Sequence, residues 1–172
     1  MITRGDSSSG AIFSDCERYR YRLWRVWDTS KPKVCFVMLN PSTADEIDLD
    51  PTVTRCRRRA EALGYGGLEV VNIFALRSTD PKALYEVSDP VGPENFAAIV
   101  QALKECAIAI CAWGVDGSFL NIGPMIKERM TQFYPGKAHY LKLNADGSPS
   151  HPLYLPYSLQ PVLWNSKHEG EA

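Results

Sequence analysis

VCFVMLNPS, residues 34–42, decides the fold, because a continuous apolar run at 34–39 ends abruptly in a polar Asn-Pro-Ser sequence. A short apolar run without alternation is typical of a strand that is buried on both faces, as in a parallel sheet covered by helices. Three more such runs follow, at 68–74, 107–113 and 138–143. The sequence therefore predicts four core strands in one parallel sheet.

Helical patterns separate these apolar runs, at 51–63, 93–106 and 118–133. Strands that alternate with helices form βαβ units. Residues 19–23 alternate apolar with charged side chains, which predicts a half-buried strand that pairs with 34–39 as a hairpin. We expect an α/β fold, a three-layer α/β/α sandwich whose mostly parallel sheet has about four core strands and one N-terminal antiparallel strand.

The length of 172 residues and the 45% share of apolar residues fit one α/β domain, which we place at residues 11–164. We expect residues 1–10 to be a flexible N-terminal arm and residues 165–172 to be a flexible C-terminal tail. The formal net charge is −1, so any contact with nucleic acid needs a local basic patch.

Cysteine usage and the absence of long apolar runs indicate a cytoplasmic protein. The five cysteines form an odd set without a CxxC pair, and we interpret them as reduced thiols. No apolar run approaches about 18 residues, so we expect no membrane span. The sequence contains no Walker A loop, GxGxxG, HExxH or zinc spacing, so we expect neither a cofactor nor a metal.

Polar residues follow the ends of the predicted strands, where open α/β sheets bind ligands. Pro41 restricts Asn40 to an extended conformation, which holds an amide with one acceptor and two donors at the sheet edge, beside Ser42. The same residues also form ordinary turns. Trp113 ends a later strand, either as a core residue or as a platform on which a ligand stacks.

Asn72 lies inside the apolar sequence VVNIF, where an amide is costly unless it is paired. It either bonds to a neighbouring loop or faces a ligand, with Phe74 as a stacking surface and Arg77 as an anion contact. Arg55 belongs to a run of arginines on the 51–63 helix, which is either a solvated face or a phosphate contact.

His151 begins the Pro-bracketed aromatic loop HPLYLPY, in which Tyr154 offers a second ring. A histidine there suits proton transfer or the stabilisation of an anion, but it can equally be bonded to the backbone. The acidic run at 45–50 suits the start of the following helix, and a metal site or a general base is the alternative.

Several segments together resemble the bacterial and phage domain of unknown function numbered sixteen forty-three, over roughly residues 12–164. That resemblance implies no activity. The segments are LNPSTAD (39–45), DPT (50–52), GYGG (64–67), VNIFALR (71–77), AWG (112–114) and HPLY (151–154).

The Asn40-Pro41 and His151-Pro152 pairs are also similar, in place and order, to two motifs of the uracil-DNA glycosylase superfamily. This resemblance implies a uracil-DNA glycosylase-like sandwich in which Asn40 positions the attacking water and His151 stabilises charge on the base. Asn72 would then read the base edge. The sequence departs from that pattern in the residues that flank both motifs.

We therefore expect a hydrolase that acts on the N-glycosidic bond of a nucleobase, with a nucleobase, nucleotide or nucleic acid as its partner. The alternatives are a non-catalytic module of phage or bacterial DNA metabolism that binds a nucleotide or modified base, and an interaction protein without a small ligand. The expected catalytic residues are Asn40, Ser42 and His151, and the expected substrate-binding residues are Asn72, Phe74, Arg77, Trp113, Tyr154 and Arg55.

Overall fold

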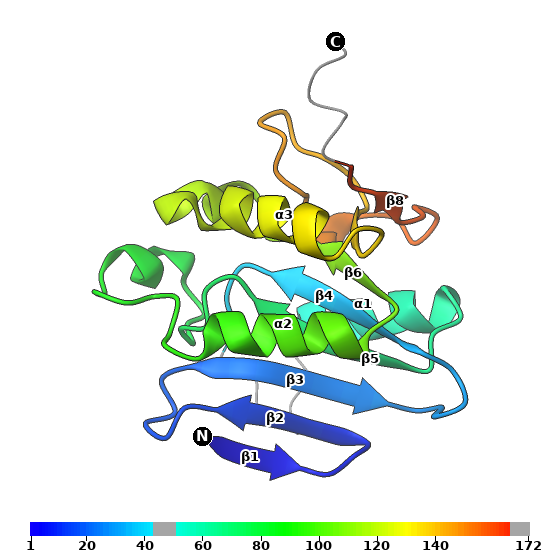
Figure 1. The fold of residues 1–172 in the computed structure, drawn as a ribbon, viewed down its shortest axis with the longest axis horizontal. Helices are drawn as coiled ribbons and strands as arrows, with labels where there is room; N and C mark the ends of the chain where they lie inside the picture. The colour runs from blue at the N-terminus through cyan, green and yellow to red at the C-terminus, as the bar shows by residue number, and fades with distance from the viewer. Residues whose placement is uncertain (43–50, 166–172) are drawn as a thin grey trace.

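The computed structural model describes residues 1–42 and 51–165 of the chain. In these ranges one eight-stranded mixed sheet runs through the molecule, in the order β1-β2-β3-β5-β4-β6-β7-β8 (Figure 1). The acidic run at 45–50 and most of the expected C-terminal tail lie outside the described residues. Within the described ranges, no helix is both long and apolar enough to cross a membrane.

The predicted helices agree with three observed ones, except that residues 118–121 belong to a separate 3-10 segment. The strands are β1 (Ile2–Gly5), β2 (Ser9–Phe13), β3 (Arg20–Val26), β4 (Lys33–Met38), β5 (Gly67–Asn72), β6 (Ile108–Cys111), β7 (Ala138–Tyr140) and β8 (Val162–Leu163). The helices are α1 (Pro51–Ala62), α2 (Asn95–Glu105) and α3 (Ile122–Phe133), and the 3-10 segments are η1 (Pro81–Tyr85), η2 (Val115–Asn121) and η3 (Pro152–Tyr154).

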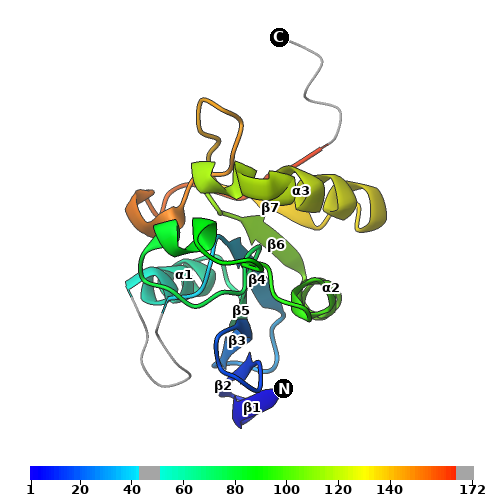
Figure 2. The same ribbon diagram turned by 90° about the vertical axis from the view of Figure 1, so that its left-hand side faces the viewer.

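The centre of the sheet confirms the four predicted parallel strands, because β5, β4, β6 and β7 pair in parallel. Strand β4 is buried on both faces, as its unbroken apolar run predicts. Phe36 packs in one hydrophobic cluster with residues of α1, whereas Val37 packs in the other with residues of α2 and α3. Figure 2 shows α1 and α2 on opposite sides of the sheet.

The expected hairpin between β3 and β4 is wrong. Strand β3 pairs antiparallel with β5, with Leu23 opposite Val70, so β5 lies between β3 and β4. The sheet as a whole is also not mostly parallel, because three described strand pairs are parallel and four are antiparallel. Apolar alternation identifies a strand, but it does not identify the neighbour with which that strand pairs.

The N-terminal residues are strands rather than the expected loose arm. Strand β1 pairs antiparallel with β2, which in turn pairs with β3 and extends the sheet (Figure 1). Gly10 permits this pairing because a Cβ there would stand 2.2 Å from the Trp24 ring. Glycine, which weakens most strands, is required here by the close approach of an indole.

Candidate functional site

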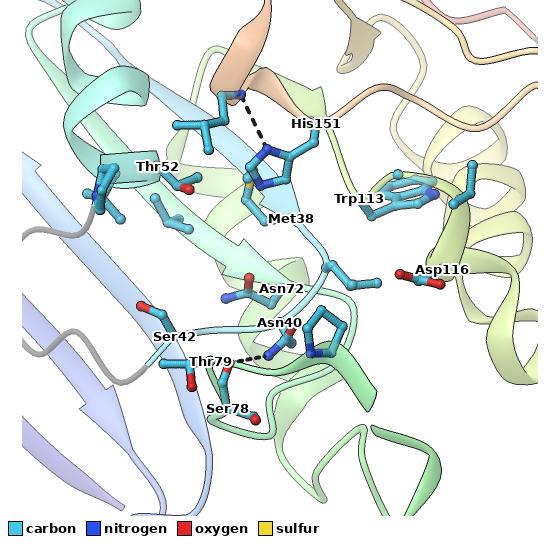
Figure 3. Close-up of a pocket in the computed structure, with 18 of the residues that line it drawn as sticks. Met38, Asn40, Ser42, Thr52, Asn72, Ser78, Thr79, Trp113, Asp116 and His151 are labelled. Carbon is cyan, nitrogen blue, oxygen red and sulfur yellow. Dashed lines mark hydrogen bonds between the residues drawn. The ribbon is translucent and has the colours of Figure 1, made fainter. Parts of the chain in front are cut away.

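A cleft of about 660 Å³ opens at the carboxyl ends of β4, β5 and β6, on the side of the sheet that α1 covers (Figure 3). This is the edge at which parallel sheets present ligand sites, and the volume is that of an ordinary small-molecule pocket. Its lining includes Arg20, Met38, Leu39, Asn40, Ser42, Thr52, Val70, Asn72, Ser78, Thr79, Trp113, Asp116, Asn144, His151 and Leu153.

Five of the nine predicted site residues line this one cleft. They come from four separate places in the chain: the end of β4, the end of β5, the residues after β6 and the start of η3. Figure 3 shows side chains from all four places around the same space. The five residues are Asn40, Ser42, Asn72, Trp113 and His151.

Asn72 is the most informative of these residues. It is the last residue of β5 and only 2% exposed, and it lines the cleft. Within the described residues, its amide nitrogen Nδ2 is buried and has no hydrogen-bond partner. An amide in that state costs free energy unless a further group satisfies it, so it is a candidate ligand contact.

Asn95, on α2, fixes the backbone at the end of β5 from the opposite side. Its Nδ2 donates to the carbonyl oxygen of Asn72 at 2.8 Å and to that of Ile73 at 3.2 Å. Asn95 is fully buried, and sequence reasoning missed it. Because its side chain binds the strand end, the position of the Asn72 amide is set by the fold.

The Asn40 side chain is held in one orientation at the rim. Its Nδ2 donates to the carbonyl oxygen of Ser78 at 2.9 Å and to that of Pro41 at 3.2 Å, and Figure 3 draws the first of these bonds. Both amide hydrogens are thereby used, and Oδ1 remains as the acceptor of this amide. An oriented carbonyl oxygen of this kind can accept a hydrogen bond from a water or from a ligand.

His151 reaches the cleft through a loop that is tied to the strand ends. The backbone N–H of Gly114 donates to the carbonyl oxygen of Pro149 at 2.8 Å, which joins the end of β6 to this loop. The backbone N–H of Leu153 donates to His151 Nδ1 at 3.3 Å, so the neutral ring carries its proton on Nε2. The imidazole therefore caps η3 and also lines the cleft.

Trp113 serves both the core and the cleft. It is 3% exposed, and its ring packs 5.8 Å from the ring of Trp164, measured between centroids. Gly117 lies against the indole, where a Cβ would stand 2.1 Å from the ring. The two interpretations of Trp113 are compatible, because one wall of the cleft is also the edge of the core.

Phe74 and Arg77 do not line the cleft. Phe74 is fully buried and packs in the core against Phe119, with 5.8 Å between ring centroids. Arg77 donates from Nη1 to the Glu17 carbonyl oxygen at 3.1 Å and lies over the Phe13 ring. Strand β5 ends at Asn72, and Phe74, two residues further on, belongs to the hydrophobic cluster on the α2 side of the sheet.

Arg55 and Tyr154 are also absent from the cleft lining. Tyr154 is 89% exposed, and Arg55 donates from Nη2 to the carbonyl oxygen of Leu155 at 2.7 Å. Arg59, one turn along α1, donates to the carbonyl oxygens of Leu155 and Pro156, each at 3.0 Å. These arginines hold the segment that follows His151 against α1.

Sequence reasoning missed several lining residues, among them Asp116, Arg20 and Thr79. Asp116 follows Gly114, whose φ of 74° turns the chain into the cleft directly after β6. The position of Asp116, shortly after the end of a predicted strand, could have identified it from the sequence. The Tyr85 hydroxyl donates to Asp116 at 3.4 Å, and burial together with this carboxylate raises the pKa of Tyr85.

Arg20 could not be placed from the pattern of its strand. The register between β2 and β3 shifts at Ile12 and Phe13, which re-aims the side chains of β3 near its start. Arg20 is consequently 2% exposed and lines the cleft, although simple alternation predicts a solvated arginine there.

No cluster of three or more His, Cys, Asp or Glu side chains suited to a metal occurs in the described residues. Fold and cleft together define an α/β protein with a pocket of mixed apolar and polar lining at the carboxyl ends of its parallel strands. The family described as Protein of unknown function (DUF1643) matches residues 20–153, and the chain belongs to that family. Among curated proteins and among solved structures, no match is found.

Proposed function

We propose that the chain binds a nucleobase-containing molecule in this cleft and hydrolyses its N-glycosidic bond. The observation that carries the proposal is the Asn72 amide, which belongs to the cleft lining and whose buried Nδ2 has no partner in the described residues. An amide offers one donor and one acceptor side by side, and nucleobase edges match that pattern. The remote resemblance to uracil-DNA glycosylases supports the same proposal. That resemblance, and the three-layer sandwich that it implies, stay predictions.

In the proposed reaction, Asn40 and His151 have different roles. Asn40 Oδ1 accepts a hydrogen bond from a water, which attacks the anomeric carbon of the sugar. The C–N bond breaks, its electron pair stays on the base, and a proton derived from the water ends on that base. His151 donates from Nε2 toward the departing base and stabilises its negative charge, and Ser42 lies beside the water. Catalysis therefore needs both Asn40 and His151.

A non-catalytic binding module is the second candidate, and two observations favour it. His151 already has a structural role, because its Nδ1 accepts the Leu153 N–H at the start of η3. Tyr154, moreover, points to solvent and does not cover the cleft. A protein that only holds a nucleotide or modified base requires the Asn72 contact and no proton donor.

The test is an assay for released base on the full chain. Its substrates are a panel of oligonucleotides with modified bases and of free nucleosides and nucleotides, and binding is measured by calorimetry in parallel. His151→Asn keeps a side chain that caps η3, and His139→Asn is the matched control because His139 contacts the Lys137 carbonyl outside the cleft. We expect Asn40→Ala and His151→Asn to lower base release by about 100-fold or more, with His139→Asn unchanged.

Binding that depends on Asn72, without any release by the wild-type chain, would select the binding module. Full activity in His151→Asn would show that the histidine is only a helix cap. If the folded chain neither binds nor cleaves any member of the panel, both candidates are wrong.

A further inference from the structure

One end of the cleft collects groups that attract an anion. Arg20 lines the cleft, and only 2% of it is exposed. A guanidinium stays protonated at every physiological pH, and a low-dielectric surrounding strengthens its field. Strand β3, which carries Arg20, is the direct neighbour of β5, which carries Asn72.

Helix α1 also begins at the cleft, because Pro51, Thr52 and Val53 belong to its lining. The first turn of a 12-residue helix carries partial positive charge and favours anions. The buried Nδ2 of Asn72 is an independent second donor, because it is a side-chain amide from the neighbouring sheet. Charge, helix end and unpartnered amide are thus three different features of the lining of one cleft.

The residues after β6 have the opposite character. Asp116 and Trp113 line the cleft there, so this region offers a carboxylate and an indole edge. A carboxylate repels an anionic group and accepts hydrogen bonds from hydroxyls. An anionic ligand group is therefore favoured beside Arg20 and α1, and an uncharged part beside Trp113.

We propose that Arg20, Asn72 Nδ2 and the first turn of α1 form a phosphate subsite, and that the ligand of the cleft is a mononucleotide. The arginine fork suits a tetrahedral oxyanion because it can donate two parallel hydrogen bonds. The phosphate subsite stands on this geometry alone, whereas the identity of the ligand as a mononucleotide rests on the proposed function.

The test is calorimetry on the full chain with inorganic phosphate, nucleosides, the matching 5′-monophosphates and a short single-stranded oligonucleotide at constant salt. We expect a monophosphate to bind at least about tenfold more tightly than its nucleoside. Arg20→Gln should abolish that difference and Arg20→Lys should keep part of it. Arg58→Gln is the matched control, because Arg58 is an exposed residue of α1.

The outcomes separate this inference from the proposed function. Equal affinity for nucleoside and monophosphate overturns the phosphate subsite and leaves nucleobase binding intact. Phosphate binding that depends on Arg20, with no nucleoside affinity, supports the subsite and refutes the nucleobase. Tighter binding of the oligonucleotide than of the monophosphate overturns the assignment to a mononucleotide, and no binding of any ligand overturns both.

A second variant covers the case in which Arg20→Gln does not fold, as judged by its thermal melt. Asn72→Asp is nearly isosteric and adds a negative charge to the subsite. Asn72→Asp should weaken the binding of the monophosphate by a larger factor than the binding of the nucleoside. An equal loss for both ligands would contradict the subsite, because it would show that Asn72 contacts only the part they share.

Discussion

Strand β5 carries two buried polar side chains, Glu69 and Asn72, whose surroundings differ completely. Glu69 is fully buried and accepts hydrogen bonds from Lys33 Nζ at 2.9 Å and from the Arg22 guanidinium. Asn72 is 2% exposed, and its Nδ2 has no partner in the described residues. A buried polar group without a partner costs about 1–3 kcal/mol. The fold alone therefore explains Glu69, whereas the Asn72 amide keeps a donor that the proposed ligand would satisfy.

The surroundings of Glu69 form a complete network. Glu105, on α2, binds the same two cations, with Arg22 Nη2 at 2.6 Å and Lys33 Nζ at 3.3 Å. The network ties β3, β4, β5 and α2 together on the face of the sheet opposite the cleft. The polar residues of this network thus hold the sheet together, whereas those of the cleft are the proposed ligand contacts.

Asn95 shows that one unpartnered atom does not by itself define a ligand site. Its Oδ1 is also buried without a partner in the described residues, but its Nδ2 binds two backbone carbonyls and it does not line the cleft. What distinguishes Asn72 is the combination of an unpartnered donor with a place in the cleft wall.

The largest effect on stability is expected from Glu69→Gln. The substitution removes the charge that pairs with Arg22 and Lys33, which are 13% and 22% exposed in the network. Breaking a buried ion pair typically costs about 3–5 kcal/mol, and urea unfolding measures the loss. Glu61→Gln, in the exposed pair with Arg57, is the control and should cost less than about 0.5 kcal/mol. A similar small cost for both variants would contradict the structural role of Glu69.

A smaller effect on stability is expected at low pH, through the protonation of Glu105 in the same network. Burial alone would raise the pKa of Glu105, but hydrogen bonds from Gln101, Arg22 and Lys33 outweigh it and lower that pKa to about 2. The stabilisation is thus present above the ordinary pKa of a glutamate and is lost as the pH falls below it. Because Glu105 is 37% exposed, solvent screening reduces its contribution to about 1 kcal/mol or less.

The comparison of wild type with Glu105→Gln measures this contribution. The wild-type chain should have the higher urea midpoint at neutral pH, and the gap should narrow as the pH falls from about 4.5 to about 2. A gap that is constant across this range would show that the Glu105 carboxylate does not titrate as the structure indicates.

The parallel core was predictable, and the edges of the sheet were not. Four unbroken apolar runs predict four buried strands because only strands covered on both faces lack alternation. The pairing of β3 with β5 depends on the path of α1 and the return of the chain, which local patterns do not encode. Strand β2, which brings β1 to the sheet, pairs with β3 because Gly10 leaves room for the ring of Trp24, a contact between distant positions.

The expectation that ligands bind at the carboxyl ends of the strands identified several residues of the cleft lining. It did not identify the hydrogen-bond partners of the predicted side chains. Asn40, Asn72 and His151 lie where the ends of their elements place them. Arg55 and Arg77 bind backbone carbonyls outside the cleft lining, because a long side chain can bind a carbonyl as readily as a ligand and sequence does not show which carbonyls lie nearby. Their positive charge was visible, but its partners were set by tertiary contacts.

The most direct test of the central claim compares the wild-type chain with Asn72→Leu in urea unfolding and in nucleotide calorimetry. The leucine removes an unpartnered amide, so we expect unchanged stability or a gain of up to about 1 kcal/mol, together with a loss of affinity of about 100-fold or more. Asn95→Leu, which breaks two hydrogen bonds to backbone, should lose stability instead. A destabilised Asn72→Leu chain that binds nucleotides as tightly as wild type would contradict the account.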